Sequence, residues 1–132
     1  MARHHTLVDE RGSSPVEFVL VGTLLTLLTL AVLQLGLAVY VRNVVHDAAV
    51  DGAYHAALAD TTPAEGVDRA RRAITRAIGA SYARDITIAT ADELGESTVT
   101  VRISTTLPVI GLLGVPGALE VEARAPEESF DD

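Results

Sequence analysis

The stretch RGSSPVEFVLVGTLLTLLTLAVLQLGLAVYV, residues 11–41, decides the fold of this chain. Its part from Phe18 to Val41 is about 24 residues long and holds no charged side chain, and about 20 apolar residues are enough for a helix to cross a bilayer. A cleavable secretory signal has a shorter apolar core of roughly 7 to 15 residues, followed by small residues at the cut. The stretch therefore predicts a transmembrane helix, at about residues 18–41, that is retained in the mature protein.

Charges on the two sides of this run predict its orientation. Arg3, Arg11 and two histidines precede it, whereas aspartates predominate after Arg42. Because cationic flanks remain in the cytoplasm, we expect a cytoplasmic N-terminus and a C-terminal part outside the cytoplasm.

Composition limits the remaining possibilities. The chain has 132 residues, no Cys and a formal net charge of -8, so it holds one small domain beside the membrane segment, without disulfides. All ten cationic residues are Arg and Ala is abundant, a bias typical of a GC-rich bacterial genome. The acidic balance disfavours nucleic acid as a partner, because phosphate binding needs clustered cations. We therefore expect a single-pass membrane protein that does not bind nucleic acid.

A helical period continues beyond the apolar run. Between Arg42 and Asp60, small apolar residues recur on one side of a helix and polar residues on the other. The small residues are Val45, Ala49, Gly52 and Ala56, and the polar ones are Asn43, Asp47, Asp51 and His55. This pattern predicts one long helix over residues 13–60, whose Ala-rich side needs cover outside the membrane.

A second helix is predicted to begin at Thr62. Thr62, Pro63 and Glu65 form a capping box with proline at the first helical position. On the exposed side of this helix, two acidic residues each stand four positions before an arginine. This spacing predicts the ion pairs Glu65–Arg69 and Asp68–Arg72. Its apolar stripe is Val67, Ala70, Ile74, Ala77 and Ile78, and it ends near Gly79.

After Asp85 the pattern alternates, which predicts three antiparallel strands in DITIATA, STVTVRIST and ALEVEARA. Arg102 is placed to pair with Glu120 and Glu122 across neighbouring strands. The connection LPVIGLLGVPG, Leu107–Gly117, is predicted to be an apolar loop. It either folds over the sheet or forms an exposed patch for a partner subunit or the membrane surface.

These elements predict a membrane α+β protein: a long N-terminal helix, a second short helix and a small antiparallel sheet of about three strands. Glu17 stands out in this plan, because a carboxylate within a bilayer costs a few kcal/mol and is usually interfacial or partnered. Two roles remain open. Ser14-Pro15-Val16-Glu17 is itself a capping box that would start the helix, or Glu17 pairs with a positive charge.

The residues around Glu17 also resemble a known family. Gly12 followed by SSPVE and an apolar run resembles the class III leader of type IV pilin-like proteins. The stretch SPVEFVLVGTLLTLLTLAVLQLGLAVYVRNVVHDAAVDGAYHAA is similar to TadE-like pseudopilins of tight-adherence (Flp) pilus and secretion systems. The resemblance implies a pilin-like fold, a leader over residues 1–12 and an extracytoplasmic head over 61–132 with an acidic tail.

It further implies that a prepilin peptidase cuts after Gly12 and leaves Ser13 as the new N-terminus. Glu17 is then the fifth residue and pairs with the terminal amine, commonly of a neighbouring subunit, which sets the assembly register. The implied partners are the cytoplasmic membrane, the peptidase, other pilins or pseudopilins, and pilus or secretion assembly proteins. The alternative is an uncleaved, membrane-anchored binding module that recruits a partner outside the cytoplasm.

Small and hydroxylated residues form a stripe along the apolar run. Its members are Gly22, Thr26, Thr29 and Gly36, continued by Leu33 and Tyr40. Such stripes let membrane helices approach closely and hydrogen-bond; alternatively, each Thr bonds its own helix backbone. Gln34 lies off this stripe and is a candidate for a polar contact.

No catalytic or metal site is predicted. The polar residues that could bind a metal ion are His46, Asp47, Asp51 and His55. Their spacing does not supply a set of three ligands typical of a metal site, and the chain has no Cys. No nucleophile elbow, phosphate loop or paired catalytic carboxylates occur, so we expect neither an enzyme nor a cofactor. A cluster of arginines is interpreted as a solvated, salt-bridged helix face; it comprises Arg69, Arg71, Arg72 and Arg76.

Overall fold

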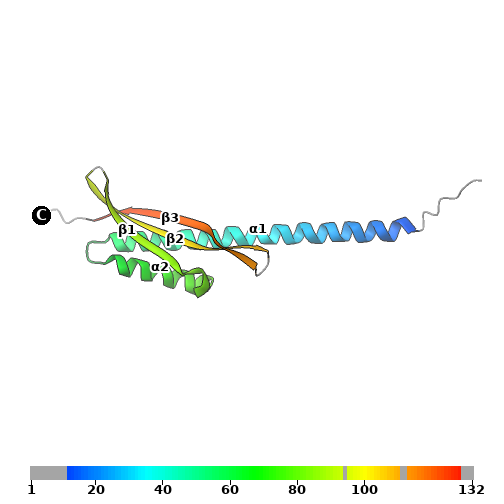
Figure 1. Cartoon of the computed structure of the whole chain (residues 1–132), viewed down its shortest axis with the longest axis horizontal. Coiled ribbons are helices and arrows are strands. Elements are labelled where there is room, and N and C mark those ends of the chain that lie inside the picture. Colours follow the sequence, from blue (N-terminus) through cyan, green and yellow to red (C-terminus); the bar gives the residue numbers. More distant parts are fainter. Residues whose placement is uncertain (1–11, 94, 111–112, 129–132) are drawn as a thin grey trace, which may run out of the picture. The chain divides into compact units, whose positions relative to one another are not determined.

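A computed structural model describes residues 12–93, 95–110 and 113–128. Its α-helices and strands, which Figure 1 labels, confirm the predicted fold class of a long apolar helix, a short helix and a three-stranded antiparallel sheet. The elements are α1 (Ser13–Ala57), α2 (Pro63–Ala77), the 3-10 turn η2 (Ala80–Tyr82), β1 (Asp85–Glu93), β2 (Glu96–Ile110) and β3 (Leu113–Pro126). Two compact units divide the chain, one ending at Leu33 and one beginning at Gln34.

In the N-terminal unit, α1 exposes apolar side chains. Phe18 is 80% exposed and Leu24 66%. The hydroxyls of Thr23 and Thr26 donate to the carbonyls of Val19 and Gly22 at 2.7 and 2.8 Å, so polar side chains are satisfied within the helix, as a membrane demands. α1 is long and apolar enough to cross a bilayer, and none of its most apolar window is buried in the protein. It is consistent with a single-pass membrane anchor.

The start of α1 corrects one prediction. Ser14 lies within the helix, because α1 already begins at Ser13. Ser14 is therefore not the N-cap, and no side-chain hydrogen bond among the residues described joins Ser14 and Glu17. Pro15 is still tolerated, since the first four amides of a helix have no helical acceptor. The capping role of Glu17 is wrong in this form.

In the C-terminal unit, α1 buries the predicted seam of small residues. Val45, Ala49 and Gly52 are buried, and the polar residues of the opposite side are exposed or half-buried. The helix ends at Ala57 rather than Asp60, because Thr61 folds back and donates from its backbone N–H to the Leu58 carbonyl at 3.2 Å. The full buried set is Val41, Val45, Ala48, Ala49, Gly52, Ala53, Ala56 and Ala57.

The two helices of this unit approach each other at a pair of glycines. A Cβ added to Gly66 of α2 would lie 2.5 Å from the Ala56 Cβ and 2.6 Å from the Gly52 carbonyl oxygen. Glycine inside a helix costs roughly 1 kcal/mol relative to alanine. The close approach of the helices is the physical reason that Gly66 is nevertheless used.

The capping box of α2 is confirmed and changes the predicted ion pairs. The Thr62 N–H donates to the Glu65 carboxylate at 2.6 Å, and the Glu65 N–H donates to the Thr62 hydroxyl at 3.4 Å. The backbone and hydroxyl donors of Thr62 lower the pKa of Glu65. Because its carboxylate turns back to the cap, the predicted Glu65–Arg69 pair is wrong.

Arg69 instead connects the two helices. Its Nε lies 2.7 Å from Oδ2 of Asp51 on α1, and this carboxylate raises the pKa of Arg69. The predicted pair of Asp68 and Arg72 is confirmed, at 2.8 Å. Four of the five residues predicted for the apolar stripe of α2 are buried or half-buried. The fifth, Ala77, is exposed because it lies at the last turn.

The sheet is a meander of order β1-β2-β3 that lies over α1 and α2 (Figure 1). Alternate residues of β2 and β3 face the helices, as predicted: Val99, Val101, Ile103, Leu119, Val121 and Ala123 are buried. The end of β3 is tied to the end of α1, because the Glu128 N–H donates to the Ala57 carbonyl at 2.8 Å. This arrangement supplies the cover that the Ala-rich side of α1 requires.

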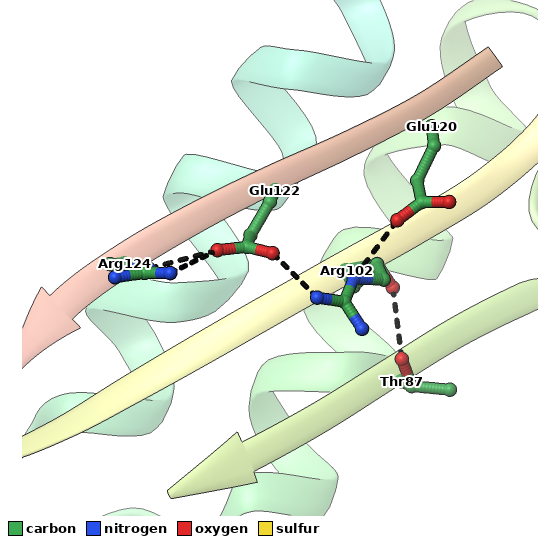
Figure 2. Close-up of polar contacts among 5 residues, drawn as sticks. All are labelled: Thr87, Arg102, Glu120, Glu122 and Arg124. Atoms are coloured by element: carbon green, nitrogen blue, oxygen red, sulfur yellow. Dashed lines mark hydrogen bonds and ion pairs between the residues drawn. The ribbon is translucent and has the colours of Figure 1, made fainter. Parts of the chain in front are cut away.

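Figure 2 shows the polar outer face of the sheet, where the predicted cross-strand pairs are confirmed. Arg102 stands opposite Glu122, with Nη2 and Oε2 2.7 Å apart, and its Nε lies 3.0 Å from Oε1 of Glu120. Arg124 also binds Glu122, at 2.8 Å. The hydrogen bond from Arg102, joined by that from Arg124, lowers the pKa of Glu122.

The connection between β2 and β3 differs from the predicted apolar loop. Its residues extend both strands, with Leu107 paired to Val115 and Pro108 to Gly114 across irregular register. A Cβ at Gly114 would lie 2.1 Å from Cγ2 of Thr106, so glycine permits the pairing. Pro108 is buried, but Gly114 to Ala118 are exposed. The segment therefore folds only partly onto the core.

Substitution of Gly66 by alanine tests the helix crossing. We expect the Gly66→Ala protein, in detergent, to lose about 1–3 kcal/mol of unfolding free energy, because the new methyl group overpacks the contact with α1. Chemical unfolding followed by circular dichroism measures it. Gly36→Ala is the matched control, since a Cβ there meets no heavy atom within 4 Å. Equal stability of the two variants would contradict the crossing.

Candidate processing and assembly site

The predicted processing residues lie at the start of α1. Gly12 directly precedes Ser13, the first residue of the helix, and both are exposed. Glu17 follows Ser13 by four residues and is exposed, so both project from the same side of the helix. In the uncut chain the Ser13 nitrogen is an uncharged amide. A cut between Gly12 and Ser13 would turn it into an amine one helical turn from the Glu17 carboxylate.

The Glu17 carboxylate has no ion-pair partner among residues 12–93, 95–110 and 113–128. The helix supplies at most a weak attraction of its own, because unpaired N–H groups near its N-terminus favour a negative charge but Glu17 lies just beyond the first turn of α1. This interaction is typically about 0.3–1 kcal/mol. It is smaller than the few kcal/mol that a carboxylate costs inside a bilayer, so within a membrane Glu17 needs water or an added cation.

The residues of the stripe remain open on the surface of α1. A Cβ at Gly22 or Gly36 would meet no heavy atom within 4 Å. Thr26 and Thr29 donate to the Gly22 and Leu25 carbonyls at 2.8 Å, as the alternative interpretation predicts. A hydroxyl that donates to its own helix can still accept a hydrogen bond from another chain. Close packing along the stripe therefore stays a prediction.

Two further polar side chains lie on the apolar part of α1, the hydroxyl of Thr23 and the amide of Gln34. Thr23 is a further hydroxyl of the apolar run that the predicted stripe omits, although its spacing of three from Thr26 is a visible signal. The Nε2 atom of Gln34 is buried without a hydrogen-bond partner in the part of the chain described. An unsatisfied buried donor costs about 1–3 kcal/mol, which keeps Gln34 a candidate for a polar contact.

The polar side of α1 outside the apolar run contains no metal-type cluster within the residues described. Asp51, the central residue of the predicted polar group, binds Arg69 of α2. Among the arginines of α2, Arg69 and Arg72 form ion pairs and Arg71 and Arg76 are exposed. The cluster thus has the character of a partly salt-bridged surface.

One hollow among the described residues lies at the β1–β2 turn, remote in sequence from Gly12 and Glu17. Its volume is about 540 Å³. It is lined by Asp92, Gly95, Glu96, Ser97, Pro126, Glu127 and Glu128. Ser97 is the one hydroxyl of this lining and has no histidine or lysine beside it there.

Comparison with known proteins supports the resemblance seen in the sequence. Residues 12–53 match the family model described as TadE-like protein, which confirms the TadE-like character of this segment. The match begins at Gly12 and includes Glu17, the entire stripe and most of the buried seam of α1. The second helix and the sheet lie beyond it. Comparisons with curated proteins and with solved structures find no match.

The TadE-like match suggests involvement in a tight-adherence pilus system and association with pilus assembly proteins in general. It covers the segment that contains every predicted processing, register and packing residue.

Disulfide crosslinking tests the stripe, because the chain has no native Cys. We expect Thr26→Cys to crosslink copies of the chain in membranes more strongly than Leu28→Cys, which projects about 200° away around the helix. Oxidation followed by non-reducing electrophoresis measures dimer yield. Equal yields, or a higher yield for Leu28→Cys, would show that the stripe is not the contact face.

Proposed function

We propose that this protein is a minor pseudopilin, cut after Gly12 by a prepilin peptidase and incorporated into, or assisting assembly of, a tight-adherence pilus or secretion apparatus. The observation that carries the proposal is the family match, which begins at Gly12 and continues through the apolar part of α1. In this proposal the chain is the substrate of a peptidase and not itself an enzyme.

Cleavage changes the charges at the start of α1. Hydrolysis of the Gly12–Ser13 amide adds water across the bond, giving Gly12 a carboxylate and Ser13 an amine that is protonated near neutral pH. The leader takes Arg3 and Arg11 with it. Glu17 is the one charged side chain between Ser13 and Arg42. The mature end of the helix therefore carries one positive amine and one negative carboxylate.

These two charges provide a register for assembly. Within a bundle of apolar helices an unpaired charge costs several kcal/mol, whereas a paired one is largely compensated. A helix inserted at the wrong height leaves its carboxylate and the neighbouring amine unpaired. The correct height is thus favoured by electrostatics, although apolar side chains alone slide past one another with little preference.

The exposed apolar surface of α1 supports both storage and assembly. Phe18, Leu24 and their neighbours are more than half exposed, and either lipid or the helices of other subunits can cover them. We propose that the chain waits in the cytoplasmic membrane with its N-terminus inside and its C-terminal unit outside. Transfer into a helical bundle then replaces lipid contacts by helix contacts of similar polarity.

Two substitutions separate processing from assembly. We expect Gly12→Val to block removal of the leader, because the prepilin peptidase of the family that the chain resembles cuts after glycine. Glu17→Gln is expected to be cut normally but to reduce incorporation into the apparatus about tenfold or more, since loss of a charged partner in an apolar bundle exceeds about 1.4 kcal/mol. Immunoblots of membrane and sheared surface fractions measure both steps.

Glu127→Gln is the matched control for Glu17→Gln, because Glu127 is an exposed glutamate of the C-terminal unit. It should be cut and incorporated like the native chain. Normal incorporation of Glu17→Gln would refute the register role. A native chain that is never cut would favour the alternative function, a membrane-anchored binding module.

A further inference from the structure

The shared end of β2 and β3 is unusually apolar for a surface hairpin. Residues 107–119 are 13 consecutive positions without a charged, hydroxyl or amide side chain. Val115 is 49% exposed, and Gly114, Pro116, Gly117 and Ala118 are also exposed. We call the described part, residues 107–110 and 113–119, the apolar hairpin. Its exposed apolar residues, Gly114 to Ala118, are not part of the core, and such residues indicate a contact surface.

The height of the hairpin along α1 follows from contacts at both ends of the sheet. The Glu128 N–H donates to the Ala57 carbonyl, which fixes the end of β3 at the end of α1. At the other end of the sheet, Leu107 packs against the buried cluster as a whole; the first buried residue of α1 in that cluster is Val41. Gly114 lies 14 residues before Glu128, and at about 3.3 Å per residue β3 can span roughly 45 Å.

The helix covers less distance over the same interval. Val41 lies 16 residues before Ala57, which is about 24 Å at 1.5 Å per residue. Even when strand inclination shortens its reach by a quarter, β3 extends past the level of Val41 toward Gln34. Figure 1 shows β2 and β3 following this part of α1. The apolar hairpin therefore lies level with the last turns of the apolar run.

That level coincides with the expected outer surface of the membrane. Counted from Phe18, a span of about 20 residues ends near Leu37. Tyr40 is 51% exposed and Arg42 is exposed, and tyrosine followed by a cation is typical of the headgroup layer. We propose that the apolar hairpin lies in the headgroup layer of the outer leaflet, so that the lipid surface is the partner that covers Val115.

Backbone hydrogen bonding restricts the hairpin to this shallow position. Among the residues described, β1 pairs with β2 only as far as Ser104, the partner of Asp85, so beyond that point the edge of β2 is free of β1. Free N–H and C=O groups are not tolerated in the hydrocarbon core, but water and lipid headgroups satisfy them. The apolar side chains favour contact with lipid while the free edge prevents deeper insertion.

Charges beside the hairpin make a smaller contribution. Arg84 lines a hollow together with Pro116 and Gly117, which places a cation next to the hairpin at the level of lipid phosphates. Asp85 lines the same hollow and offsets part of this attraction. Apolar contact is therefore the main source of affinity. Contact between the apolar hairpin and lipid would attach the C-terminal unit to the membrane at a second point, beside α1. This second point would restrict rotation of the unit at the membrane surface.

Single tryptophans test the contact, because the chain has no native Trp or Cys. Val115→Trp is compared with Ala91→Trp, an exposed position near the β1–β2 turn, and with Leu24→Trp in the apolar run. Each full-length protein is reconstituted in phosphatidylethanolamine and phosphatidylglycerol vesicles whose acyl chains carry bromine either near the headgroup or near the chain end. Circular dichroism checks the fold.

We expect the fluorescence emission of Val115→Trp to lie at shorter wavelength than that of Ala91→Trp. It should be quenched most by bromine near the headgroup. Leu24→Trp should be quenched more by deep bromine, and Ala91→Trp should not be quenched. A nitroxide on Val115→Cys gives an independent readout: greater accessibility to oxygen than to a water-soluble nickel chelate supports lipid contact. This readout also decides the question if the larger tryptophan disturbs the hairpin.

The proposal rests on the membrane anchor of the proposed function, and the three positions distinguish the two failures. Leu24→Trp quenched beside unquenched Val115→Trp overturns the lipid contact alone. Val115→Trp that is blue-shifted but unaffected by bromine also overturns it, since protein would then cover the hairpin. An unquenched Leu24→Trp overturns the membrane span and both proposals with it.

Discussion

The buried seam of α1, from Val41 to Ala57, is the constraint on which the rest of the C-terminal unit depends. Its side chains are mostly alanine, so partners must approach closely to exclude water. Gly66 permits this for α2, and alternate residues of β2 and β3 supply the larger side chains of the core. A three-stranded sheet is marginal by itself. It is stable here because one helix offers a continuous apolar strip along the strands.

Up to Leu33 the same helix is not covered by the rest of the described chain, and its apolar side chains are exposed on every side. No folding within residues 12–33 can satisfy them, so their burial has to come from lipid or from other helices. That requirement is shared by any membrane anchor. What distinguishes this chain is the position of Glu17, the fifth residue after the predicted cut, within the segment that matches the TadE-like family.

Much of the fold was accessible from the sequence because it depends on local rules. The period of Val45, Ala49 and Gly52 and the capping box at Thr62 involve neighbours along one helix. Where two elements compete for one group, local rules fail: Glu65 caps its own helix, which leaves Arg69 for Asp51. The apolar hairpin was predicted to be a loop because Gly and Pro concealed its strand pairing. The processing and register roles of Gly12 and Glu17 came from resemblance and remain predictions.

The N-terminal mass of the protein from its native membrane tests the central claim most directly, when hosts with and without the prepilin peptidase are compared. The account predicts a mature chain that begins at Ser13 where the peptidase is active, and an uncut chain where it is absent. A chain that begins at Met1 or Ala2 in the active host would contradict it.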